Sequence, residues 1–529
     1  MKLTFGAGLN ENQYASHHEA FVGSQNFELR KDASHLSPRK AFDLKATAPN
    51  GGAIRGIMQL VARDGSQFTV IQAANTLYYW DGASTFTDFS LTVDAGSRLR
   101  GTFWELDDMM VISDLDRLTP MLKITYDGTN FHLAELQTGL VYSLYAKYAI
   151  VHDGRLWLFN IRTAEPTDLP HMILVSEFED AESYDTTKRV LDQSFTSGEE
   201  AFYMLSPDLR SINGAKLIRG DLIISTTEGN IYKLTGSDST TYAFEAFYAG
   251  SAAIGDESMV DTGNDIMYMK KGGSIESLRA TAEYGDTAVD DLSRWIPDTV
   301  QNLTSALGVY DQQNQKVLFF CLGKVLVLFK DILIGGAVVT EQGEKAKLSP
   351  WSVYVTADPG DFNTQAALYM REPGTDIFNV FWGGSDGRIF VINGTGEGDA
   401  GSASIRMVRT TRFISKQDAK INFTSHVTQG LIQYRRMSAL DFSITLDWGD
   451  EFNQSTATIP LKGAPADSPG VFYGGSVYYG ADNYYNQGFS YANKITHQNC
   501  SWVGKGSGCS VIMTTLDTQQ YQVDNIELL

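Results

Sequence analysis

The sequence predicts an all-β protein that contains an irregular β-propeller. The chain of 529 residues has 49 glycines, 25 tyrosines and 28 phenylalanines. Glycine supplies the positive φ angles that tight turns require, and aromatic side chains favour strands. Hairpin signals recur along the chain, whereas the best helical segments, residues 178–193 and 290–307, are short, and the second contains Pro297. We read both segments as connectors.

Two segments have the full pattern of an antiparallel hairpin. Residues 221–236 place a glycine-bearing turn with Gly229 between two β-rich runs. Residues 378–394 repeat this design, with the turn at Asp386-Gly387. Each segment therefore predicts two paired strands.

Shorter units of the same kind recur along the chain. Two spacings, 46 residues from Asp81 to Asp127 and 43 residues from Tyr232 to Ile275, match those of four-stranded propeller blades. Each unit combines a polar or glycine turn with an aromatic or aliphatic strand. The repeat predicts five or six blades between Gly51 and Asp399. The units are residues 75–82, 122–128, 152–159, 273–278 and 324–329.

A change in pattern follows the propeller region. Residues 394–402 contain four glycines and read as a linker. Beyond it, residues 441–448 alternate strictly between apolar and polar side chains, as a half-buried strand does. Residues 471–490 are rich in Gly, Tyr and Asn and predict a long loop. We predict an N-terminal arm at 1–50, a propeller at 51–400 and a separate β domain at 401–529.

The acidic balance of the chain restricts its partners. There are 63 acidic and 42 basic residues, for a net charge of −21. Such a surface repels phosphate, which argues against a nucleic-acid reader that binds by counterion release. Simple solubility explains the charge, and so does a conduit that must not adhere to passing DNA.

The three cysteines are too few for a disulfide framework. Cys321 lies in an apolar run and is expected in the core, while Cys500 and Cys509 flank a glycine-bearing turn and could face each other across a hairpin. The N-terminus has no apolar signal region. The most hydrophobic stretch, residues 325–340, is interrupted by charged residues and is too short to span a bilayer. We expect a soluble protein of a reducing cytoplasm.

Motifs for catalysis are sparse. Gly-x-Ser-x-Gly occurs once, around Ser385, but between two predicted strands and not at the strand-to-helix turn of a nucleophile elbow. His17 and His18 are adjacent, so their side chains diverge and joint metal binding is not expected. We therefore predict no catalytic, cofactor-binding or metal-binding residues, no cofactor and no enzymatic activity.

Paired acids are more frequent and keep one alternative open. Two carboxylates can serve glycoside hydrolysis, which also occurs on propellers. We favour solvated loops over that reading, but a carbohydrate-binding or glycan-cleaving propeller remains the alternative function. The acids concerned are Asp107-Asp108, Asp114 with Asp116, Asp256-Glu257, Asp290-Asp291 and the run from Glu177 to Asp185.

The order of several short motifs resembles the tail nozzle proteins of short-tailed bacteriophages, also called B-type tail tubular proteins or tail hubs. The likeness covers nearly the whole chain, and each motif is weak without the others. It begins with a glycine-led segment, an Asn-Phe strand and a basic residue beside a proline. The matching segments are residues 5–11, 24–30, 36–39, 173–184, 221–236, 264–278, 309–320, 349–354, 411–413 and 443–448.

The resemblance implies a structural component of the virion tail, assembled in the host cytoplasm. A homohexamer would close the distal tail tube, its platform built from the N-terminal arm and the C-terminal β-rich domain. Its partners would be the adaptor ring, tail fibres or tailspikes, and genomic DNA that passes through the lumen without specific binding. No membrane insertion is expected. Six copies would multiply the negative charge, so we expect an acidic lumen.

Overall fold

The chain divides into two compact units that are interleaved along the sequence. One consists of Leu44–Gly323 and Gly360–Val391, and the other of Met1–Asp43, Lys324–Pro359 and Ile392–Leu529. The helices of the described part of the chain are all too short or too polar to cross a lipid bilayer. The computed structural model describes residues 2–3, 21–28, 37–163, 167–192, 194–250, 252–278, 291–335, 337–339, 345–347, 349–356, 359–392, 407–411, 414–415, 427–435, 442–450, 453–461, 495–504, 508–515 and 522–528.

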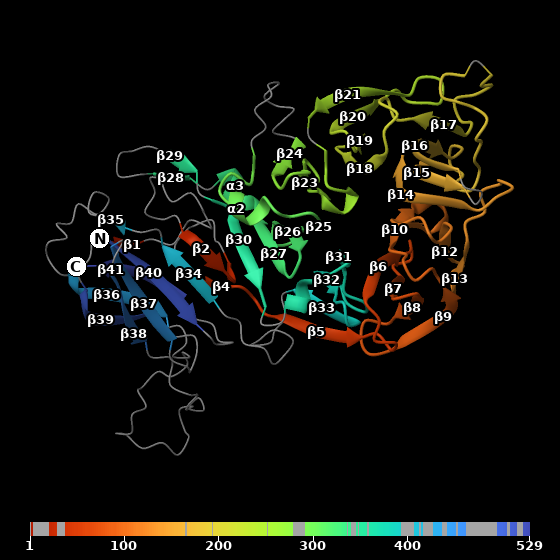
Figure 1. Ribbon diagram of the computed structural model, residues 1–529. Helices are drawn as coiled ribbons and strands as arrows, with labels where there is room; N and C mark the ends of the chain where they lie inside the picture. The colour runs from red at the N-terminus through yellow and green to blue at the C-terminus, as the bar shows by residue number, and fades with distance from the viewer. Residues whose placement is uncertain are drawn as a thin grey trace. The chain divides into compact units, whose positions relative to one another are not determined.

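The first unit is a β-propeller with seven blades (Figure 1). This confirms the predicted all-β propeller, but five or six blades is too low a count. The repeat is obscured by the long connection between β16 and β17 and by the segment of the other unit that separates the sixth and seventh blades. The blades are β6 Ile54–Val61, β7 Gln67–Ala73, β8 Thr76–Trp80 and β9 Phe86–Thr92; β10 Leu99–Trp104, β11 Met109–Asp114, β12 Leu122–Tyr126 and β13 Phe131–Glu135; β14 Leu144–His152, β15 Arg155–Thr163, β16 Asp168–Val175 and β17 Phe202–Leu205; β18 Ile212–Ile218, β19 Asp221–Thr226, β20 Asn230–Thr235 and β21 Ala243–Ala249; β22 Met259–Asp261, β23 Ile266–Met269 and β24 Ile275–Ser277; β25 Leu307–Asp311 and β26 Lys316–Cys321, the part of the sixth blade in this unit; and β31 Ala366–Arg371, β32 Phe378–Gly383 and β33 Arg388–Ile392.

The position of a strand within its blade determines its burial. In β11 every residue is buried, and β15 is buried over its first seven residues. In contrast, the outermost β9 has no buried residue. Inner strands are covered on both faces by neighbouring blades, so continuous apolar runs form them without alternation. Apolar clusters are buried between neighbouring blades, such as the one that joins Met58 and Val70 of the first blade to Ile112 and Ile124 of the second.

The N-terminal part of the chain completes the last blade. Strand β5 (Phe42–Thr47) joins β31, β32 and β33 in one sheet. The main-chain N–H of Ile54 then donates to the carbonyl of Gly384 at 3.1 Å. Gln59 adds a further link from the first blade to the last, because its amide donates to the Arg371 carbonyl at 2.7 Å and accepts from the Arg371 N–H at 3.1 Å. These contacts close the ring.

The two hairpins predicted from sequence are confirmed. β19 and β20 pair across a turn in which Gly229 has φ 96°, and β32 and β33 pair across a turn in which Gly387 has φ 82°. Both weak helical segments are connections. Residues 178–192 contain turns and no helix in their described part, and α2 (Pro297–Val300) is a single turn that begins at Pro297.

The second unit is also β-rich and combines the N-terminal and C-terminal parts of the chain, as predicted. The first strand pairs with the last, with Lys2 opposite Glu527, and β2 pairs with β34 and runs parallel to β30. One sheet has the order β1-β41-β36-β39, and the other contains β27-β30-β2-β34-β40-β37-β38. The strands are β1 Lys2–Leu3, β2 Phe21–Gln25, β3 Phe27–Glu28, β4 Ser37–Pro38, β27 Lys324–Phe329, β28 Ala337–Val339, β29 Lys345–Lys347, β30 Trp351–Val355, β34 Met407–Thr411, β35 Ile414–Ser415, β36 Val427–Arg435, β37 Phe442–Asp450, β38 Asn453–Leu461, β39 Ile495–Gly504, β40 Gly508–Thr515 and β41 Gln522–Leu528, with one helix, α3 Lys330–Gly335.

The cysteine predictions have different outcomes. Cys321 is buried in β26, as expected for a core residue. Cys500 and Cys509 do not face each other across one hairpin. Cys500 lies in β39 opposite Gly430, and Cys509 lies in β40 opposite Trp448, so the two cysteines belong to different sheets.

Candidate functional site

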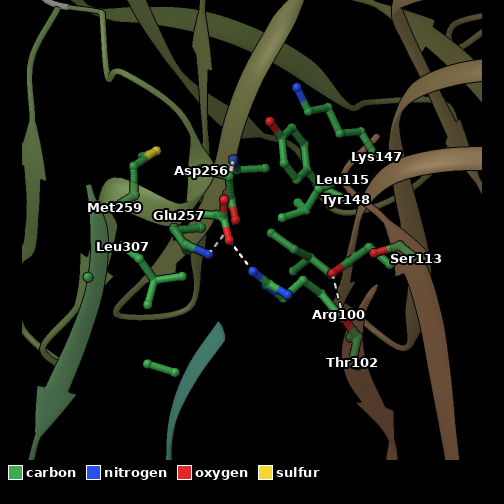
Figure 2. Close-up of a pocket in the computed structure, with 17 residues that line it drawn as sticks. Arg100, Thr102, Ser113, Leu115, Lys147, Tyr148, Asp256, Glu257, Met259 and Leu307 are labelled. Atoms are coloured by element: carbon green, nitrogen blue, oxygen red, sulfur yellow. Dashed lines mark hydrogen bonds and ion pairs between the residues drawn. The ribbon is translucent and has the colours of Figure 1, made fainter. Parts of the chain in front are cut away.

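A pocket of about 210 Å³ lies on the propeller axis. The first strands of the seven blades contact one another in a closed ring, from β6 through β10, β14, β18, β22 and β25 to β31 and back to β6. Six of these strands line the pocket, along with the turn before β22 and residues in and just after β11. Figure 2 shows the charged side chains that enter it from opposite walls.

Glu257 and two arginines form an ion-paired clamp across this pocket. Glu257 precedes the fifth blade, and its carboxylate accepts from Arg98 Nη1 at 2.8 Å and from Arg100 Nη2. Arg98 also pairs with Asp116 at 2.8 Å. These side chains are only 20–33% exposed, so water screens them less than it screens a surface pair. The clamp therefore connects the second and fifth blades through the axis.

Arg100 reaches two further blades. One of its terminal nitrogens donates to the carbonyl of Arg55 at 2.8 Å, and the other to the carbonyl of Gln365 at 2.7 Å. Arg55 lies in the first blade, and Gln365 directly precedes the seventh. One guanidinium thus contacts four blades, which a planar group with five donors can do.

A buried carboxylate fixes the loop that carries the clamp. Asp114 is 1% exposed and accepts five hydrogen bonds, four from main-chain N–H groups and one from the Ser97 hydroxyl. One of those N–H groups belongs to Arg98 and another to Asp116. Asp114 is therefore a positioning residue for the ion pair between them.

The pocket also contains a second ion pair and one lysine that pairs with no described residue. Lys216 Nζ lies 2.8 Å from the carboxylate of Asp256. Lys147 Nζ lies 5.6 Å from the centre of the Tyr148 ring, and no described residue forms a hydrogen bond or ion pair with it. Burial lowers the pKa of Lys147, and repulsion from Arg117 adds to this effect.

Tyr148 follows Lys147 in β14 and also lines the pocket. Its hydroxyl donates to the main-chain carbonyl of Asn213 at 3.0 Å. Burial raises the pKa of Tyr148 well above its usual value, and the nearby charges of Asp256 and Glu257 act in the same direction. Tyr148 is thus a neutral hydrogen-bond donor and not a proton-transfer group at neutral pH.

The remaining residues that sequence analysis considered are not brought together. Ser385 lies in the turn between β32 and β33, which confirms a hairpin and not a strand-to-helix elbow. His17 and His18 lie outside the described residues. No cluster of three or more metal-ligating side chains occurs among the residues that the structure describes.

The paired acids mostly support the local fold. Asp290 lies outside the described residues. Four of the other acids have hydrogen-bond partners. Five tryptophans that could stack on a sugar ring are fully buried in the core: Trp80, Trp104, Trp157, Trp351 and Trp382. Asp107 accepts from the Trp104 indole at 3.1 Å, Asp108 from the Arg63 N–H at 3.0 Å, Asp291 from the Ser293 N–H at 2.8 Å and Glu182 from the Gln137 N–H at 2.7 Å.

Three of the motifs that underlie the family resemblance meet in the second unit. Asn26 Oδ1 accepts from Arg39 Nε at 2.9 Å and from the main-chain N–H of Val355 at 2.8 Å. Arg39 is 3% exposed, and its guanidinium lies 5.6 Å from the ring centre of Tyr354. The Tyr354 hydroxyl donates to Glu28 at 2.6 Å. The Asn-Phe strand, the Pro-Arg step and residues 349–354 therefore form one buried polar cluster.

Sequence analysis missed the role of Arg98, Arg100 and Lys147. No motif contains them, although the alternate spacing of Arg98 and Arg100 places two cations on the same face of an extended segment. Glu257 was noted only as one member of an acidic pair.

Comparisons with known proteins identify no family. No protein-family model matches the sequence, and no curated protein matches it. Among solved structures, the chain is similar to the WD40 domain of Neurospora crassa Pan2, with a TM-score of 0.39 and 8% identity over 68% of this chain and 97% of that one. It is also similar to YCF48 bound to D1 peptide, with a TM-score of 0.38 and 12% identity over 67% and 95%. Saccharomyces cerevisiae Sqt1 gives a TM-score of 0.36 and 12% identity over 66% and 99%. At these scores the likenesses carry no further argument, and the blades themselves define the propeller.

Proposed function

We propose that this protein is a structural component of a short phage tail, a nozzle that closes the distal end of the tail tube as a homohexamer. The observation that carries the proposal is the ordered series of motifs along the chain. It is supported by the cluster of Asn26, Arg39 and Tyr354, in which three of those motifs are neighbours.

The organisation of the chain agrees with this role. The N-terminal and C-terminal strands pair in one β-rich unit, and the propeller is inserted between them in sequence. In the proposal, the β-rich unit supplies the platform of the ring and contacts the adaptor proteins. Fibres or tailspikes are the other protein partners.

DNA conduction in this proposal belongs to the ring of copies and not to the axis of one propeller. Arg100 and Glu257 bridge that axis, so side chains occupy it. The net charge of −21 supports a lumen past which DNA moves without binding. A lumen found to be basic would contradict this part of the proposal.

Immunogold electron microscopy of the corresponding virions tests the proposal. Antibodies raised against this chain are expected to label the distal end of the tail, while antibodies against a capsid protein label the head and serve as the control. Virions without label, from lysates in which the same antibodies detect the protein, would refute the nozzle role. A glycan-hydrolysis screen would then become the next experiment, because it tests the carbohydrate-active alternative.

A further inference from the structure

We propose that the axial pocket of the propeller binds one small oxyanion of the carboxylate or phosphate class, with the Lys147 ammonium as its main ligand. The inference concerns a single copy of the chain and does not depend on the proposed nozzle role. It is argued from the balance of charge in the pocket, from the hydrogen-bonding groups that face it and from its size.

The charges that line the pocket do not cancel. Three cations and two carboxylates face it, and four of these five groups are already paired. Arg100 pairs with Glu257, and Lys216 with Asp256. Just outside the lining, Arg98 pairs with both Asp116 and Glu257, and the buried Asp114 carboxylate accepts hydrogen bonds from neutral donors. Lys147 is the lining cation that forms no ion pair with a described residue, so an anion held at its ammonium group would supply the contact that it lacks.

The surroundings of Lys147 favour an anion over an additional cation. Both Arg117 and Arg98 are close enough to repel its ammonium group, and burial deprives it of water. Asp116 and Asp256 attract it, but more weakly than burial and Arg117 oppose it. A bound anion would relieve this repulsion and replace lost hydration, because a charge-assisted hydrogen bond is strongest where water is excluded. Figure 2 shows Lys147 above the Tyr148 ring, on the side of the pocket remote from Met259 and Leu307.

A neutral donor is available beside the cations. Ser113 lies opposite Arg100 in the β10–β11 pair and is 2% exposed. No hydroxyl hydrogen bond joins Ser113 to another described residue, although its side chain lines the pocket. Hydroxyl and ammonium donors together are the usual ligands of carboxylate and phosphate oxygens.

The size of the pocket limits the ligand. A volume of about 210 Å³ is below the roughly 300–1,000 Å³ typical of sites for drug-sized ligands. An anion of a few heavy atoms fits, whereas a nucleotide or an oligosaccharide does not. The class is therefore a free small anion such as inorganic phosphate or a short carboxylic acid.

Isothermal titration calorimetry of the full chain with sodium phosphate, and separately with sodium acetate, tests the inference at a constant ionic strength set with sodium chloride. We expect one site per chain, with a dissociation constant of about 1 mM or lower for at least one of the anions. The preferred anion distinguishes the phosphate from the carboxylate source. K147Q should weaken binding at least about tenfold, whereas K147R should retain most of it.

A matched control separates the pocket from general surface charge. Lys233 lies in β20 outside the pocket, and its Nζ is 2.7 Å from the carboxylate of Asp221. K233Q should therefore bind the anion as the parent does. In chloride alone, K147Q should melt at or slightly above the parent temperature, because Lys147 forms no ion pair with a described residue and both burial and Arg117 disfavour its charge. Absence of binding by the parent, equal binding by K147Q, or loss of binding in K233Q would overturn the inference. A K147Q variant that melts well below the parent in chloride would also overturn it, since Lys147 would then be structural.

Discussion

Replacing Glu257 with glutamine perturbs the axial clamp with almost no change in side-chain volume. The carboxylate accepts one charge-assisted hydrogen bond from Arg98 and one from Arg100, and it is 20% exposed on its side chain. An amide retains a neutral hydrogen bond but leaves Arg100 without its counter-charge and Arg98 with Asp116 alone. Hydrogen bonds to charged groups contribute about 1.5–3 kcal/mol each, against about 1 kcal/mol for neutral ones. After a discount for partial exposure, we expect E257Q to lose about 2–3 kcal/mol of unfolding free energy.

This loss corresponds to a measurable shift in melting temperature. The propeller unit has roughly 300 residues, so its unfolding entropy makes 1 kcal/mol equivalent to about 1.6 °C. Differential scanning calorimetry should therefore place the propeller transition of E257Q about 3–5 °C below that of the parent. The control is D221N, which breaks the exposed Lys233–Asp221 pair and should change the transition by less than about 1 °C. An E257Q transition within about 1 °C of the parent would refute a stabilising clamp.

Three further predictions concern the fold around the site. D114N should lose about 2–4 kcal/mol of unfolding free energy, measured by urea denaturation, because the amide NH2 would face main-chain N–H groups that donate to the Asp114 carboxylate in the parent. A variant as stable as the parent would contradict this. G383A should lose about 1–3 kcal/mol of unfolding free energy, because the added Cβ would lie 2.1 Å from a carbon of Ile54. In the same assay the control G255A should be nearly as stable as the parent, because its added Cβ would have no atom within 4 Å. The Lys188 ammonium is the largest cause that holds the pKa of Glu200 at about 2, below its ordinary 4.5, so Glu200 stabilises the fold above pH 4.5 and loses this contribution as pH falls toward 2. Melting temperatures of the parent and E200Q should accordingly differ at neutral pH and converge near pH 2, and a constant difference would argue against the linkage.

The local structure of the propeller was accessible from sequence because hairpins are determined by neighbouring residues. Gly229 and Gly387 supply positive φ between β-rich runs, and both turns form where the sequence placed them. Cys321 was assigned to the core from its apolar run, and it is buried in a strand with both faces covered. In each case the residues that predict the feature are close neighbours in sequence of the residues that form it.

The blade count and the order of strands in the second unit were less accessible. The three-stranded fifth blade and the long β16–β17 connection distort the repeat, and β5 joins a blade whose other strands are more than three hundred residues away in the chain. Similarly, Cys500 and Cys509 are close in sequence but lie in different sheets, because β39 pairs with β36 whereas β40 pairs with β34 and β37.

The sequence by itself determined the all-β class and the propeller, because alternation, turn residues and apolar runs are local properties. The pairing of the two chain ends joins residues more than five hundred positions apart, and the sequence offered it only through the family resemblance. Only the tertiary structure decided which charges meet on the axis. Arg98 and Glu257 are separated by 159 positions, and neither residue has a local pattern that selects the other. Their pairing, and the absence of an ion pair between Lys147 and any described residue, follow from ring closure, which brings the first strands of six blades around one small pocket.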